Sequence, residues 1–119
     1  MRETIHGVTI EWLDAAGPKL GSLQSGLDLI GDSFGQEVAL FAIPVARLEP
    51  DFLRLSSGLA GEFIEKLQQY GVRLAIVGDI SAPVASSKPL HDFVYETNRR
   101  GQHLFVRDAD ELRARLAAR

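Results

Sequence analysis

Three short apolar runs constrain the fold of this chain more than any other feature. They are Val38–Ile43, Arg73–Val77 and His103–Val106, and each is the length of a β-strand. A strand with no polar alternation is typical of a sheet that is covered on both faces. Segments of helical length, with apolar residues three or four positions apart, separate the runs. This alternation predicts right-handed crossovers onto a largely parallel sheet.

The N-terminus adds a different strand pattern. Thr4–Ile5 and Val8–Leu13 flank His6-Gly7, a pair suited to a two-residue hairpin turn. Between positions 8 and 12 apolar and polar residues alternate, as in a strand with one exposed face. We therefore predict a single α/β domain over residues 1–119, with a mixed, largely parallel sheet, an N-terminal hairpin and about four helices.

Apolar spacing and capping residues locate the helices. The first is expected to bury one face made of Leu23, Leu27, Ile30 and Phe34. The longest is expected between about Phe52 and Tyr70, with a buried stripe made of Leu55, Leu59, Phe63, Leu67 and Tyr70.

The last two helices have clearer start signals. Ser87 is a suitable N-cap and Gly101 a suitable end for the third helix, after a loop from Ile80. Asp108 and Glu111 form a capping box for the fourth.

Composition excludes several classes of function. The chain has no cysteine, so disulfides, zinc–thiolate sites and thiol nucleophiles are excluded. Thirteen basic and sixteen acidic residues give a net charge of −3, without the basic stripe that a nucleic-acid partner requires. There is no signal-peptide pattern and no apolar run of the ~20 residues that cross a membrane. We expect a cytoplasmic protein.

Ser33 lies in a sequence that matches a hydrolase nucleophile elbow, Gly31-Asp32-Ser33-Phe34-Gly35. That motif functions on a turn from a strand into a helix, whereas this one ends a predicted helix and precedes a strand. The histidines have no metal-ligand spacing, and no standard phosphate-binding loop is present. We therefore predict no catalytic residue, no metal and no cofactor.

Gly58 and Gly61 lie inside the predicted long helix, where each costs about 1 kcal/mol relative to alanine. One explanation is close approach of the helix to the sheet. The other is that the helix begins near Ser56-Ser57-Gly58, with free N–H groups facing solvent. Because the apolar stripe already begins at Phe52, we expect Ser56 and Ser57 in mid-helix, with their hydroxyls against the sheet.

A polar cluster lies at the predicted carboxyl edge of the sheet, where open parallel sheets bind ligands. Its candidate residues for a ligand or partner surface are Asp79, Ser81, Glu96, Asn98 and Arg99. The alternative is structural: the first two cap local turns, and the charged residues form a surface ion pair.

The segment from Ser56 to Gly61, with the following helix and Tyr70–Gly78, resembles the centre of a STAS domain, the fold of anti-sigma-factor antagonists. The whole chain also resembles a group of small bacterial proteins classified only as a domain of unknown function. In the antagonists a kinase phosphorylates the motif serine, which implies Ser56 or Ser57 as a switch here. Leu55 stands where that family has an aspartate.

The resulting hypothesis is a small regulatory or protein-interaction module whose partner is another protein. The competing hypothesis is a small-ligand-binding protein or enzyme that uses the polar cluster. A third is a homodimer whose interface contains Trp12 or other exposed apolar residues.

Overall fold

The computed structural model describes residues 1–118 and contains one five-stranded sheet with its strands in sequence order. The strands are β1 (Arg2–Ile5), β2 (Val8–Trp12), β3 (Leu40–Pro44), β4 (Arg73–Val77) and β5 (Leu104–Val106). β1 and β2 pair antiparallel, and every later pair is parallel. The predicted α/β fold with a mixed, largely parallel sheet is confirmed, as is the parallel arrangement of the three apolar strands.

The predicted hairpin turn is also present. Ile5 pairs with Val8, so only His6 and Gly7 connect the two strands. Both have positive φ, 47° and 80° respectively, as a type I′ turn requires.

Within residues 1–118, four α-helices and two short 3-10 helices connect the strands, and a fifth α-helix follows the last strand. The helices are α1 (Leu23–Ser33), α2 (Leu59–Gln69), α3 (Ser81–Ala85), α4 (Lys88–Arg100) and α5 (Ala109–Ala117), and the 3-10 turns are η1 (Val45–Arg47) and η2 (Leu55–Ser57). The predicted N-caps of α4 and α5 are confirmed, since Ser87 accepts from the Leu90 N–H and Asp108 accepts from the Glu111 N–H. The return bond of the predicted capping box differs, because the Glu111 carboxylate accepts from the Arg107 N–H and not from that of Asp108. α3 lies in the segment that was predicted to be a loop, so that prediction is wrong.

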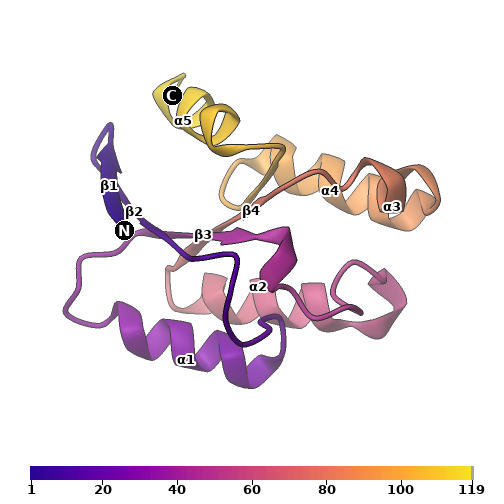
Figure 1. The fold of residues 1–119 in the computed structure, drawn as a ribbon, viewed down its shortest axis with the longest axis horizontal. Coiled ribbons are helices and arrows are strands. Elements are labelled where there is room, and N and C mark those ends of the chain that lie inside the picture. The colour runs from indigo at the N-terminus through magenta and orange to yellow at the C-terminus, as the bar shows by residue number, and fades with distance from the viewer. Residues whose placement is uncertain (119) are drawn as a thin grey trace.

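The helices cover the two faces of the sheet unequally. Strands that follow one another in order through right-handed crossovers place all their connecting helices on one face. α1, α2 and α4 accordingly share a core with Phe41, Ile43 and Leu74. α5, which follows the last strand, packs on the opposite face against Leu40, Ala42 and Leu104. Figure 1 shows α5 on one side of the sheet and α1 and α2 on the other.

α1 buries a face that overlaps the predicted one only at Ile30. Its buried residues are Ser25, Gly26, Leu29 and Ile30. Leu23, Leu27 and Phe34 keep 44%, 39% and 68% of their surface exposed.

The reason is the small size of Gly26 and the internal bonding of Ser25. A Cβ at Gly26 would lie 3.4 Å from the Phe63 ring of α2, so the glycine brings the two helices together. The Ser25 hydroxyl donates to the Ser22 carbonyl and accepts from the Gly21 N–H, which satisfies a buried polar group.

The helix predicted to be the longest, α2, starts at Leu59, seven residues later than predicted, and with 11 residues it is shorter than α4 with 13. Its buried residues are Ala60, Phe63 and Leu67. Gly58 precedes it with φ 80°, a left-handed conformation that interrupts a helix and favours glycine. Phe52 is fully buried because it packs edge-on against Phe63, with ring centroids 5.7 Å apart. The apolar stripe before Gly58 therefore belongs to a packed loop.

The close-approach explanation for the two glycines is also wrong. A Cβ at Gly58 would meet only the Glu62 carboxylate at 3.9 Å, and one at Gly61 would have nothing within 4 Å. Gly58 is explained by its φ, and Gly61 lies in an exposed stretch of helix.

Arg113 of α5 ties this helix to the hairpin. Its guanidinium donates to both carboxylate oxygens of Glu3, at 2.9 and 3.0 Å, and lies 5.1 Å from the centroid of the Trp12 ring. These hydrogen bonds lower the pKa of Glu3. Trp12 is half-buried under this contact.

Candidate partner-binding groove

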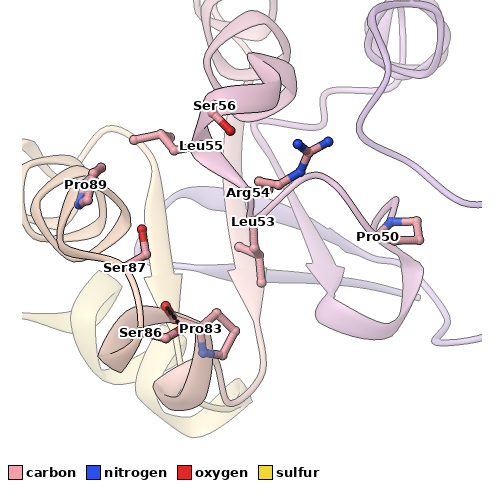
Figure 2. Close-up of a pocket in the computed structure, with 9 residues that line it drawn as sticks. All are labelled: Pro50, Leu53, Arg54, Leu55, Ser56, Pro83, Ser86, Ser87 and Pro89. Atoms are coloured by element: carbon pink, nitrogen blue, oxygen red, sulfur yellow. Dashed lines mark hydrogen bonds between the residues drawn. The ribbon is translucent and has the colours of Figure 1, made fainter.

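An open groove lies between the loop before α2 and the junction of α3 with α4. Its volume is about 750 Å³, and its lining residues are Pro50, Leu53, Arg54, Leu55, Ser56, Pro83, Ser86, Ser87 and Pro89. Figure 2 shows the two walls facing each other, residues 50–56 on one side and residues 83–89 on the other. Arg54 is the one ionisable residue in this lining. We call this hollow the partner groove.

The first wall is held in shape by hydrogen bonds around Ser57. Its hydroxyl donates to the Asp51 carbonyl at 2.8 Å and accepts from the Leu59 N–H at 3.2 Å. Ser57 thus joins both ends of the loop and satisfies one of the free N–H groups at the start of α2. Arg54 forms an exposed ion pair with Asp51 at 3.1 Å.

Ser56 differs from Ser57 in its exposure and in its hydrogen bonding. Its side chain is exposed, lines the partner groove, and has no hydrogen-bond partner among residues 1–118. The expectation that both serines lie in mid-helix against the sheet is wrong, because they belong to η2 and precede Gly58. Of the two predicted switch residues, Ser56 is the one with a free hydroxyl.

The second wall is the start of α4. Ser87 caps this helix and Pro89 follows in its first turn, where proline costs no hydrogen bond. The Ser86 hydroxyl donates to the Pro83 carbonyl at 3.2 Å, which fixes the turn between α3 and α4. The positive end of the α4 dipole therefore opens at the partner groove.

The five residues of the predicted polar cluster do not line one common hollow. Asp79 and Ser81 line a small one of about 270 Å³ with Arg107, at the carboxyl ends of β4 and β5. The Asp79 carboxylate accepts from the Ser81 N–H at 2.9 Å. Hydrogen bonds from Ser81, with a smaller contribution from the charge of Arg107, lower the pKa of Asp79.

The other three residues lie on α4 and are engaged elsewhere. Arg99 donates to both oxygens of Glu96 on the exposed side of the helix, and these bonds lower the pKa of Glu96. Asn98 binds the backbone of β5: its amide donates to the Phe105 carbonyl at 3.1 Å and accepts from the Phe105 N–H at 2.7 Å. The observed contacts of these residues are those of a surface ion pair and a strand cap.

Ser33 ends α1, and its hydroxyl donates to the Ile30 carbonyl at 2.7 Å. Its context is therefore the end of a helix, as the sequence indicates. In the described part of the chain, no three of His, Asp and Glu are placed so that they could hold a metal ion. None of the described helices is long and apolar enough to span a membrane.

The apolar residues of the partner groove were not singled out from sequence. The available signal was the three prolines, Pro50, Pro83 and Pro89, which accompany two leucines and three serines in two separate segments, residues 50–56 and 83–89. Nothing in the sequence pattern places those segments opposite each other.

The model of the family described as "Domain of unknown function (DUF4180)" matches residues 5–116. No curated protein and no solved structure matches this chain.

Proposed function

The chain belongs to the DUF4180 family, which carries no assigned role, and we propose that it is a protein-interaction module whose partner groove binds an extended segment of another protein. The occupant that fits best carries apolar side chains and one carboxylate. The observation that carries this proposal is the lining of the partner groove: two leucines, three prolines and three serines around a single arginine.

The composition of the partner groove favours a protein partner. Centres of protein interfaces are depleted of charged residues, and arginine is the charged residue that they retain. Leu53 and Leu55 offer apolar contact between walls that prolines stiffen. An extended segment laid between these walls would bury both leucines.

The positive charge in the partner groove favours a partner segment that carries a carboxylate. The only formal charge in the lining is that of Arg54, and the N-terminal end of α4 adds a positive partial charge on the facing wall. Asp51 occupies one side of the guanidinium. Arginine has five N–H donors, so a second carboxylate is accommodated.

Ser56 is proposed as the regulatory position of this module. A phosphate there would add about −1.5 to −2 charges at the rim of the partner groove, two residues from Arg54. It would compete for the guanidinium and repel the carboxylate of the partner segment. Phosphorylation is therefore expected to weaken binding.

Site-specific photo-crosslinking in the native cell tests the proposal. p-Benzoylphenylalanine at position 55 or position 89 reports from the two walls, and at the exposed Gln24 of α1 it serves as the control. We expect the same protein adduct from both walls and not from position 24. Arg54→Glu and Ser56→Asp should each reduce that adduct, while Ser56→Ala should retain it.

Two results would overturn the proposal. One is an adduct pattern that is the same from position 24 as from the walls. The other is an adduct with the mass of two copies of this chain, which would assign the partner groove to a homodimer.

A further inference from the structure

A second hollow lies between α2 and α4, near the amino-terminal ends of β4 and β5. Its volume is about 190 Å³, and it is lined by Ile64, Gln68, Phe93, Thr97, Arg100, Gln102 and His103. It continues into a shallower hollow of about 380 Å³, which shares Ile64, Gln68 and Phe93 with it. We call the deeper of the two the histidine cavity.

His103 is the most deeply buried polar residue of this lining, with 4% of its surface exposed. Its Nδ1 accepts from the Leu74 N–H of β4 at 3.2 Å. A neutral imidazole that accepts at Nδ1 carries its proton on Nε2. The two ring nitrogens face opposite ways, so the Nε2–H points away from β4.

That N–H has no partner among residues 1–118. A buried donor without an acceptor is unfavourable, and native structures leave few of them. The exposed side chains of Gln68, Arg100 and Gln102 surround the histidine cavity and are free to move aside. Nε2 is itself buried, so an acceptor atom that enters from solvent reaches it only when these side chains shift.

The charge state of His103 restricts what that acceptor is. Burial, assisted by the charge of Arg73, lowers the pKa of His103 to about 4. The ring is neutral at pH 7, and it offers a hydrogen bond rather than a charge. The cation available in the lining is Arg100, whose guanidinium supplies further donors.

We propose that the histidine cavity binds a small monocarboxylate with an apolar body. One carboxylate oxygen accepts from the Nε2–H of His103, and Arg100 binds the other. Ile64 and Phe93 contact the apolar body. Among residues 1–118, no acidic residue lines the histidine cavity itself, and Glu65 lines the adjoining shallower hollow.

Benzoate, with neutral benzamide as the matched probe, tests this assignment by ¹H–¹⁵N NMR titration of the whole chain. We expect benzoate to shift the side-chain resonance of His103 Nε2 and the amides of Thr97 and Arg100. Benzamide should bind about tenfold more weakly, because hydrogen bonds to a charged group are the stronger ones.

Two variants make the test specific. His103→Asn retains an acceptor near the Nδ1 position for the Leu74 N–H but removes the Nε2–H. Arg100→Gln removes the exposed charge. Each should weaken benzoate binding about tenfold or more, with the dispersed spectrum of the folded chain retained.

The proposal is overturned if benzoate leaves the His103 Nε2 resonance unshifted. It is equally overturned if benzamide binds as tightly as benzoate, or if Arg100→Gln binds benzoate as the wild type does. The Nε2 resonance and Arg100→Gln decide the matter even if His103→Asn fails to fold. None of these readouts depends on the partner groove.

Discussion

The two faces of one sheet are built differently in this protein. On one face a single helix, α5, buries Leu112 and Leu116 against the strands and is tied to the hairpin through Arg113. On the other face are α1, α2 and α4, and both the partner groove and the histidine cavity lie between these helices or at their ends. The difference teaches that hollows form between helices and at their ends where several helices share a face.

The two seams of the three-helix face also differ. Between α1 and α2, Gly26 allows a contact close enough to bring the Phe63 ring against the backbone, and a hollow of about 240 Å³ remains between Leu23 of α1 and the exposed side of α2. Between α2 and α4 there is no such residue pair, and Gly61 faces open space. The histidine cavity lies along this second seam, and the partner groove lies beyond the amino-terminal ends of both helices.

The largest expected effect is on the face of the sheet that α5 covers. Leu112→Ala should lower the free energy of unfolding by about 3 kcal/mol, because Leu112 is fully buried and no neighbouring helix can close the cavity. Leu27→Ala on α1, where 39% of the side chain is exposed, is the control and should cost less than about 1 kcal/mol. Urea unfolding measures both, and equal losses would contradict the comparison.

The next effect concerns the stability of the protein in acid, which depends on His103 between α2 and α4. The folded pKa of His103, about 4, lies below its usual 6.5, so its contribution to stability is complete above pH 6.5 and is lost as the pH falls toward 4. The loss is at most about 3 kcal/mol. His103→Asn should flatten this part of the stability profile, whereas His91→Asn, at an exposed position, should not. Parallel profiles for wild type and His103→Asn would refute the assignment.

A pair of glycines sharpens the comparison within one helix. Gly58→Ala should cost about 1–2 kcal/mol, because φ of 80° is strained for alanine. Gly61→Ala should gain up to about 1 kcal/mol, since the added methyl faces open space within a helix. Thermal melts should therefore shift in opposite directions, and shifts of the same sign would contradict this account of the helix start.

The smallest effect distinguishes the two serines. Ser57→Asp should cost about 1 kcal/mol, because a carboxylate cannot donate to the Asp51 carbonyl although it can still accept from the Leu59 N–H. Ser56→Asp should change stability by less than about 0.5 kcal/mol, because this side chain is exposed and unbonded. If Ser56→Asp were the more costly variant, Ser56 would be structural and the proposed switch would fail.

The sequence was most informative where a residue type is compatible with a single local structure. Apolar strands need cover on both faces, and this requirement predicted three parallel strands correctly. Ser87 and Asp108 cap helices because short polar side chains reach the free N–H groups there.

The sequence was least informative where small residues determine how helices pack and where they begin. Leu23, Leu27 and Phe34 form an apolar stripe with Ile30, but Gly26 lets α1 pack through an adjacent face that shares only Ile30 with that stripe. Gly58 shows in the sequence as a cost to a helix, and its φ is set only when the loop before it packs. The partner groove is formed by residues 50–56 and 83–89, which are about thirty residues apart in the chain. Local sequence patterns do not predict that such distant segments face each other.

Asn98 has a consequence for how the protein behaves at high concentration. A terminal strand normally exposes a row of unpaired N–H and C=O groups, which is a template for edge-to-edge aggregation. β5 has only three residues, and the Asn98 amide already occupies both outward backbone groups of the middle one, Phe105. A strand from another molecule would have to displace that amide before it could pair, so this end of the sheet is protected against fibre-like growth.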